Sequence, residues 1–254
     1  MAREEVTLQR EAGVAVLTVA QAPRDAEGLV GLMEALAEAC AEIAAAGGAN
    51  VVVIAGGPAA LDLGSIAGLH PAPEEEGAGR LSLAQPLAGL GCPVLAALQG
   101  PVTGEGLELA LACDIRLAAE GASFSLPQLR TGLMPCDGGT QRLARIVGKA
   151  KALEMILTGQ AIDAREADRI GLVNRLFPPG ELLPLTMEMA RKMALQAPLA
   201  MSFAKEAICH GLEMNLSQGL RLEADLYFLL HTTQDRREGI TAFQEKRTPH
   251  FEGR

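Results

Sequence analysis

The chain has 254 residues, 49% of them hydrophobic, and a formal net charge of −9, a composition typical of a globular protein of one or two domains. This acidic balance disfavours non-specific binding to nucleic acid, which needs clustered lysine and arginine side chains. The N-terminal segment lacks the apolar stretch of a secretory signal, and prolines and glycines interrupt the charge-free residues 81–104, so we predict no membrane span and expect a cytoplasmic protein.

The first half of the chain alternates between apolar strands and helices. Short β-branched or apolar runs predict strands at 13–20 and 50–57, and apolar residues at helical spacing predict a helix over 29–46 that ends at two glycines. This strand–helix–strand order predicts parallel pairing through a right-handed crossover. Residues 58–80, which include His70 and three consecutive glutamates, are expected to form a surface loop. Further strands are predicted at 92–100 and 113–120.

From Gly138 onward the pattern becomes mainly helical, with one more strand predicted at 171–177. The predicted helices cover 138–147, 149–158, 163–170, 181–195, 198–210, 216–232 and 235–246. The sequence therefore predicts an α/β layer followed by a helical segment that packs on its own core or on a neighbouring chain.

An acidic pair stands out in the sequence TGEGLELALACDI, residues 103–115. Glu105 and Glu108 are three residues apart, so on a helix they share one face, near the positive end of the helix dipole. A solvated first-turn glutamate explains Glu105 well, and its carboxylate is equally consistent with the surface or with a site. If both carboxylates face one dry cleft, burial and mutual repulsion would raise a pKa and provide a general acid near neutrality.

Cysteine and histidine residues give no sign of a metal centre or a disulfide framework. The five cysteines have no C-x-x-C spacing and the four histidines are scattered. We expect most of the cysteines to be small buried hydrophobic residues and predict no metal site.

Four segments together resemble the crotonase, or enoyl-CoA hydratase/isomerase, superfamily: CPVLAALQGPVTGEGLELALACDIRLA, GLMPCDGGTQRLARIVGKAKALEMILTG, IDAREADRIGLVNRLFP and TTQDRREGITAFQEKR. The resemblance implies an α/β fold with a crotonase-like ββα spiral core, residues 1–180, and a C-terminal helical trimerisation region, residues 181–254. It also implies a homotrimer or a homohexamer built as a dimer of trimers. The implied substrate is an acyl-CoA thioester, with coenzyme A present only as part of the substrate and no other cofactor.

The resemblance assigns two backbone N–H groups to stabilise the enolate oxygen formed from the thioester. These donors are Leu61 and Glu105. The family usually has glycine where this chain has Glu105, but only the backbone N–H is required. Donors of this kind typically lower a barrier by ~3–4 kcal/mol each.

The acid/base residues depart from the family pattern. Hydratases of the family hold a water between two glutamates; the first matches Glu108, but Gln128 occupies the second position. Glutamine orients water but does not donate a proton to carbon. Asp137 lies in the loop where dienoyl-CoA isomerases and dihydroxynaphthoyl-CoA synthases place a working aspartate. We therefore hypothesise a Glu108–Asp137 acid/base pair positioned by Gln128 and Glu105; a helix N-cap role explains Asp137 equally well.

For the nucleotide end, the resemblance points to Phe243 and Lys246 in a C-terminal helix that reaches a neighbouring subunit, and to Asp62. An amphipathic helix with Phe243 inside and Lys246 outside is the alternative. The function implied is hydration of an enoyl-CoA. Two alternatives are a double-bond isomerase, which tolerates Gln128, and a non-catalytic acyl-CoA-binding or RNA-associated relative.

Overall fold

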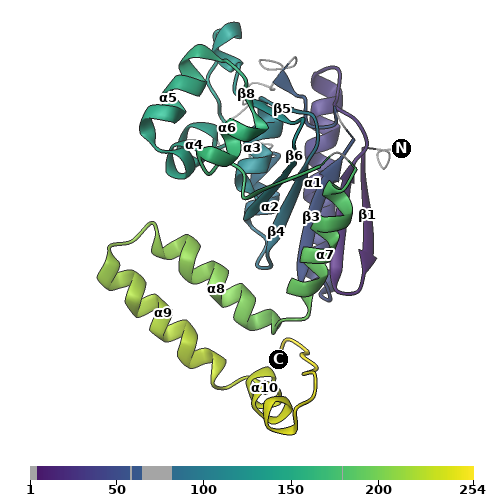
Figure 1. Ribbon diagram of the computed structural model, residues 1–254, viewed down its shortest axis with the longest axis vertical. Helices are drawn as coiled ribbons and strands as arrows, with labels where there is room; N and C mark the ends of the chain where they lie inside the picture. Colours follow the sequence, from purple (N-terminus) through teal and green to yellow (C-terminus); the bar gives the residue numbers. More distant parts are fainter. Residues whose placement is uncertain (1–4, 58, 65–81, 179) are drawn as a thin grey trace.

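A six-stranded sheet lies at the centre of the computed structural model, which describes residues 5–57, 59–64, 82–178 and 180–254 (Figure 1). Its strands run in the order β1-β2-β3-β4-β6-β9; β1 and β2 are antiparallel, and the remaining neighbours are parallel. The bounds are β1 Val6–Glu11, β2 Val14–Val19, β3 Val51–Gly56, β4 Val94–Leu98, β6 Ile115–Ala119 and β9 Arg175–Phe177. The predicted parallel pairing of the two strands around the first helix is confirmed.

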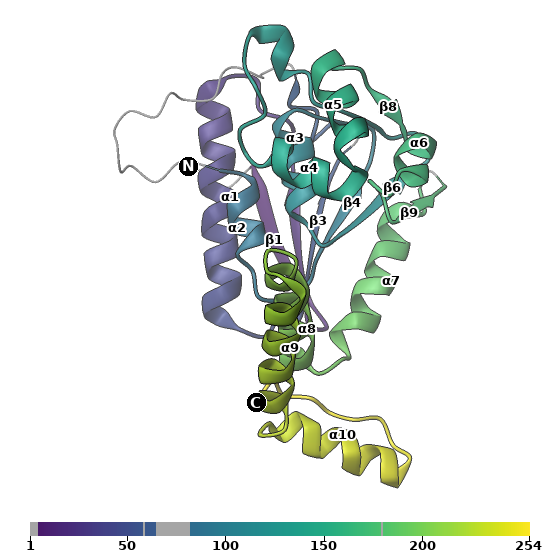
Figure 2. The same ribbon diagram turned by 90° about the vertical axis from the view of Figure 1, so that its left-hand side faces the viewer.

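Helices cover both faces of this sheet, which explains why its central strands read as continuous apolar runs. On β3, Val52 and Ile54 pack toward helices α1 (Ala26–Ala46), α2 (Ala84–Ala88) and α3 (Glu105–Ala112). The alternate residues Val51 and Val53 pack toward α7 (Leu182–Ala194). Figure 2 shows α1 and α7 on opposite sides of the sheet.

A second, three-stranded sheet positions the acidic helix. It pairs β5 (Pro101–Thr103) with β7 (Ser123–Ser125) in parallel, and β7 with β8 (Ile162–Asp163) in antiparallel. Thr103 pairs with Ser125 at the ends of their strands, so α3 and the 3₁₀ helix Gln128–Thr131 begin side by side. This pairing brings Glu108 and Gln128 together across 20 residues of sequence.

The C-terminal helices extend away from the sheet (Figures 1 and 2). After α4 (Gly139–Val147), α5 (Lys149–Thr158), α6 (Ala164–Arg169) and α7, the helices α8 (Pro198–Gly211) and α9 (Leu216–Leu230) pack against each other as a hairpin, and α10 (Gln234–Glu245) follows. Across the described chain, α8 has no buried residue and α9 has only Leu226. Large apolar side chains are therefore left exposed on these helices.

Several sequence-based expectations need correction. The strand predicted over 92–100 ends at Leu98, because Gly100 takes a positive φ of 73° before β5, and the strand predicted over 171–177 begins only at Arg175, after a turn at Gly171. Strands β1, β5, β7 and β8 were not predicted. Only Cys40 and Cys113 are buried. His70 and most of the predicted loop 58–80 lie outside the described residues, and no helix in the described ranges is long and apolar enough to cross a membrane.

Candidate active site

The Glu108 carboxylate lies at the centre of a buried hydrogen-bond network. Its Oε1 atom accepts the backbone N–H groups of Asp137 and Gly139, each at 2.7 Å, and its Oε2 atom accepts Gln128 Nε2 at 3.2 Å. A Cβ atom on Gly139 would lie 2.9 Å from Oε1, so glycine permits this close approach. The side chain has no exposed surface. Three donors fix the carboxylate in one orientation, facing Gln128.

The environment of Glu108 shifts its proton affinity into the neutral range. Burial is the largest cause and raises the pKa of this carboxyl to about 7. The N–H groups of Gly139 and Asp137 act in the opposite direction, and the charges of Asp137 and Glu105 raise the pKa further. A carboxyl group of this kind can take up and release a proton at neutral pH.

Gln128 holds the position predicted for it, beside Glu108 and buried. An ionised carboxylate only accepts hydrogen bonds, so the amide nitrogen is the atom that faces Glu108. The other amide atom, Oε1, is buried and has no hydrogen-bond partner among the described residues. This oxygen is an acceptor available to a bound water or substrate group.

Glu105 points its carboxyl group into the protein rather than into solvent. Only 2% of the residue is exposed, and its Oε2 atom is buried without a partner in the described part of the chain. Burial raises the pKa of this carboxyl, the N–H of Glu105 itself lowers it, and the charge of Asp137 raises it. The sequence left the surface and the interior equally open for this side chain, and the structure places it in the interior.

The two predicted oxyanion donors, Leu61 and Glu105, lie on segments that pack directly against each other. A Cβ atom on Gly106 would lie 2.1 Å from the Leu61 carbonyl oxygen, so only glycine allows α3 to approach the Leu61 loop this closely. Thr103 N–H donates to that same carbonyl at 3.0 Å. Within the described ranges, neither the Leu61 N–H nor the Glu105 N–H has an acceptor in another residue. The Glu105 N–H faces the residue's own carboxyl group, which a ligand oxygen would replace as acceptor.

Asp62 stabilises the approach of these two segments. Thr103 Oγ1 donates to Asp62 Oδ1 at 2.5 Å and accepts the Gly64 N–H at 2.6 Å. These bonds attach both sides of the Leu61 loop to the end of β5, one residue before Gly104 and the start of α3. Asp62, which the resemblance assigned to the nucleotide end, therefore bonds to Thr103 and supports the segments that carry Leu61 and Glu105.

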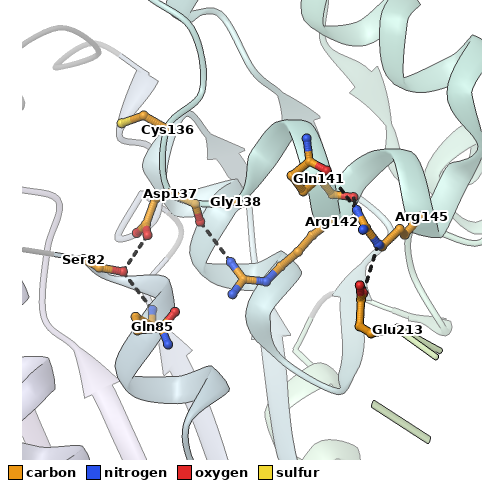
Figure 3. A pocket seen from close by; sticks show the side chains of 9 residues that line it. All are labelled: Ser82, Gln85, Cys136, Asp137, Gly138, Gln141, Arg142, Arg145 and Glu213. Atoms are coloured by element: carbon orange, nitrogen blue, oxygen red, sulfur yellow. Dashed lines mark hydrogen bonds and ion pairs between the residues drawn. The ribbon is translucent and has the colours of Figure 1, made fainter. Parts of the chain in front are cut away.

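The Asp137 carboxylate caps a helix, but not the one expected from the sequence. It accepts Ser82 Oγ at 2.5 Å and the N–H groups of Leu83 and Ala84 at 2.9 Å each, at the start of α2. The N-cap of α4 is instead Gly138, with no side-chain cap bond. Figure 3 shows Asp137 directed toward Ser82, at the edge of a cavity of about 450 Å³. Its backbone N–H, and not its carboxylate, contacts Glu108.

Phe243 and Lys246 are not brought to this site within one chain. Phe243 is 84% exposed, Lys246 ends α10 in a left-handed conformation, and α10 lies at the opposite end of the molecule from α3 (Figure 1). No local sequence motif indicated that Ser82 would donate to Asp137 or that the Gly139 N–H would donate to Glu108. The described residues contain no group of three or more His, Cys, Asp and Glu side chains placed to hold a metal ion.

Comparison with known proteins assigns the chain to a family. The family profile described as Enoyl-CoA hydratase/isomerase matches residues 9–254, so the chain belongs to this family. It is 48% identical over 162 residues to the 2,3-dehydroadipyl-CoA hydratase of Escherichia coli, and 46% identical over 164 residues to a probable mitochondrial enoyl-CoA hydratase of Arabidopsis thaliana. These alignments cover 64% and 65% of this chain, and 64% and 54% of the two relatives.

Solved structures match the chain over almost its whole length. The enoyl-CoA hydratase of Bacillus anthracis, at 33% identity, gives a TM-score of 0.83 over 99% of this chain and 100% of the other. An enoyl-CoA hydratase from Mycobacterium marinum, at 29% identity, also gives 0.83, over 98% and 100%. The predicted crotonase-type α/β fold with a C-terminal helical region is therefore confirmed.

Proposed function

We propose that this chain hydrates a 2-enoyl-CoA thioester, adding water across the conjugated double bond through a stabilised enolate. One observation carries the proposal: a fully buried Glu108 with three hydrogen-bond donors lies on the helix whose first N–H group is unpaired by other residues. The names of the relatives support the same reaction class, since both are hydratases of CoA thioesters.

The proposed mechanism uses the N–H groups of Leu61 and Glu105, which have no acceptor in another described residue, as oxyanion donors. The thioester oxygen accepts hydrogen bonds from Leu61 and Glu105, and the first turn of α3 adds a partial positive charge. Negative charge develops on this oxygen when a nucleophile adds to Cβ. Donors already aimed at that charge lower the barrier by ~3–4 kcal/mol each, because they need no reorganisation.

The water is held by Glu108 and Gln128. Glu108 Oε2 accepts one hydrogen of the water and Gln128 Oε1, which has no partner in the described chain, accepts the other. As the water oxygen bonds to Cβ, its proton passes to Glu108. Gln128 orients the water without changing charge. The reaction transfers no electrons to or from a cofactor, so we propose no cofactor beyond the coenzyme A of the substrate.

We further propose that residues 181–254 form an oligomerisation region, beyond a spiral core over 1–180, and build a trimer or a dimer of trimers. The exposed apolar side chains of α8, α9 and the turn between them, among them Leu212 and Leu216, support this assignment because one chain leaves them uncovered. In such an assembly Phe243 and Lys246 contact the CoA bound to a neighbouring subunit, with Lys246 pairing with phosphate. Asp62 acts within its own subunit, through Thr103.

The test is to mix the purified protein with crotonyl-CoA, follow the loss of conjugated-thioester absorbance, and identify the product by mass. The hydratase proposal predicts the gain of one water, with Glu108→Gln as the inactive matched variant. If neither crotonyl-CoA nor a 2-enoyl-CoA with a distal carboxylate gains water, hydration is excluded.

One observation favours a second candidate, a double-bond isomerase. Gln128 has no acidic proton to give to carbon, and its nitrogen is already bonded to Glu108. An isomerase moves a single proton between two carbons and therefore requires fewer acid/base groups. It would exchange protons at the α or γ carbon of a 3-enoyl-CoA in D2O without incorporating water.

A further inference from the structure

We propose that the Glu105 carboxyl group is the acid that delivers the proton to Cα of the substrate, replacing the glutamate that is absent at position 128. This inference rests on the proposed hydration and assigns its missing proton donor. Glu105 would then serve the reaction twice, through its backbone N–H and through its side chain.

The first argument is the state of the carboxyl group. Glu105 is 2% exposed, and within the described residues no donor reaches its Oε2 atom. An ionised carboxylate oxygen left without a donor in the protein interior is costly, whereas a neutral carboxylic acid removes most of that cost. A neutral carboxylic acid at this position carries a proton that it can donate.

The second argument is the charge around Glu105. The Asp137 charge acts on Glu105, and the charges of Asp137 and Glu105 act on Glu108, one turn along α3. Neither α2 nor β5 carries a charged residue. On α4, Arg142 donates to the Asp137 carbonyl and Arg145 pairs with Glu213. Asp62, on the Leu61 loop, is bonded to Thr103.

The surroundings of Glu105 and Glu108 decide which of these two carboxyl groups carries a proton. Burial raises the pKa of both Glu105 and Glu108, so the pair binds a proton more tightly than two exposed carboxyl groups would. Three donors stabilise the ionised form of Glu108, while the unpartnered oxygen of Glu105 favours the protonated form. Their different environments thus make Glu105 the acid and Glu108 the base.

The third argument is reach. The Glu105 N–H is one of the two donors proposed to hold the thioester oxygen, and the Glu105 carboxyl group faces that same N–H. Cα is bonded to the carbonyl carbon that carries this oxygen. In the proposed binding mode, a carboxyl group beside this N–H therefore comes within reach of Cα. Gln128, by contrast, directs its only proton-bearing group toward Glu108.

The proton balance closes. The water oxygen bonds to Cβ, its proton passes to Glu108, and the double-bond electrons move onto the thioester oxygen. When the carbonyl re-forms, Cα takes the proton of the Glu105 carboxyl group. Glu108 is then protonated and Glu105 ionised, and transfer of the proton from Glu108 to Glu105, directly or through water, restores both groups. The net change is the addition of one water.

The experiment compares Glu105→Gln and Glu105→Ala with the wild-type protein. Both variants retain the backbone N–H, so the oxyanion donor is unchanged. Removal of a general acid predicts a loss of about 10²–10⁴ in kcat with little change in KM. The variants should also lose the fall in activity at high pH, because the group whose deprotonation causes it is gone. Binding of butyryl-CoA serves as the check that the site is intact.

Proton exchange separates the two carboxyl groups. In D2O, the wild-type protein should exchange the Cα hydrogen of butyryl-CoA, a step that involves Cα but no added water. Glu105→Gln should abolish this exchange and Glu108→Gln should retain it. The double variant Glu105→Gln/Gln128→Glu should recover part of the hydration activity, because it returns a carboxyl group to the site.

Failure of this inference is distinct from failure of the proposed function. If the wild-type protein hydrates crotonyl-CoA while Glu105→Gln keeps the wild-type kcat and pH profile, Glu105 is not the acid. If the wild-type protein exchanges the Cα hydrogen but hydrates no enoyl-CoA, hydration is wrong and the assignment of Glu105 stands on the exchange alone.

Discussion

Gln128 Nε2 donates a hydrogen bond of 3.2 Å to Glu108 Oε2, and both side chains are buried. The two residues meet because the strands that precede them, β5 and β7, pair through Thr103 and Ser125. Since glutamine has no charge to change, the pH dependence of this pair comes from Glu108 alone. The charges of Asp137 and Glu105 raise the pKa of Glu108 further.

Activity should increase as Glu108 loses its proton, because a base must be ionised to accept one. Because the pKa of Glu108 is raised to about 7, kcat/KM for hydration should rise with pH through about 7.

Gln128→Glu places a second negative charge beside Glu108, and a like charge raises a pKa. The rising limb should therefore move to higher pH, as measured by the pH profile of kcat/KM. Gln160→Glu, at an exposed position, is the matched control; an unchanged limb in Gln128→Glu would mean that another group controls it.

Stability should depend on pH with a sign set by Glu108. Its folded pKa of about 7 exceeds its ordinary value of 4.5, so the folded state binds the proton more tightly than the unfolded state does. Its contribution to stability is then fully present below pH 4.5 and is lost as pH rises through about 7. Glu108→Gln removes this loss, which amounts to at most about 3 kcal/mol.

This effect is measured by denaturant unfolding at a fixed protein concentration. Glu108→Gln should gain free energy of unfolding relative to the wild-type protein at pH 8 and show a smaller difference at pH 5. Glu34→Gln, on the exposed face of α1, should behave like the wild-type protein at both values. A constant offset between Glu108→Gln and the wild-type protein would rule out the proposed linkage.

The elements that the sequence predicted are those whose buried residues follow one regular spacing along the chain. The apolar runs of β3 and β4 and the helical spacing in α1 place these elements within a few residues, because packing on both faces of the sheet enforces them. β1 was missed because most of its residues are at least partly exposed. β8 has only two residues and depends on its pairing with β7.

The candidate site was predictable in its residues but not in their directions. The motif placed Glu108, Gln128 and Leu61, and the structure brings them to one region. Local sequence cannot tell which helix an aspartate caps: Asp137 precedes α4 but binds the start of α2, more than fifty residues earlier. The burial of Glu105 was equally undetermined, since it depends on the elements packed around α3.

Gly106 should be intolerant of even one added methyl group. Its Cβ would lie 2.1 Å from the Leu61 carbonyl oxygen, so Gly106→Ala forces the Leu61 loop away from α3 and separates the two N–H donors. We expect a fall of about 10²–10³ in kcat, the cost typical of losing one oxyanion donor. Gly121→Ala is the control, because nothing lies within 4 Å of its Cβ position. Equal kcat values for the two variants would argue against the Leu61 donor.

Oligomerisation should depend on the uncovered apolar side chains between α8 and α9. Leu212 and Leu216 are 81% and 78% exposed in one chain, so a contact between subunits would remove apolar surface from water. Leu212→Glu/Leu216→Glu should lower the molar mass in solution, measured by light scattering, from that of a trimer or hexamer toward that of the single chain. Leu157→Glu, on α5 and 64% exposed, is the comparison. A wild-type protein that is already a single chain would refute the proposed assembly.

Asp137 tests whether the loop before α4 positions Glu108 or performs proton transfer itself. The acid/base hypothesis predicts that Asp137→Asn loses most of kcat with folding unchanged. In the structure, the carboxylate is engaged by Ser82, Leu83 and Ala84 at the start of α2. We therefore expect the opposite pattern for Asp137→Asn and Asp137→Ala: a loss of about 1 kcal/mol in the free energy of unfolding from the weakened cap, larger for alanine.

The kinetic readout distinguishes the two roles. Asparagine retains one oxygen acceptor for α2 and the backbone N–H to Glu108, so kcat should fall only modestly in Asp137→Asn. Removing the negative charge should also lower the pKa of Glu108, because the Asp137 charge raises it. The rising limb of the pH profile should accordingly shift to lower pH. A near-complete loss of kcat in Asp137→Asn, without a change in stability, would restore Asp137 as an acid/base residue and weaken the assignment of that role to Glu105.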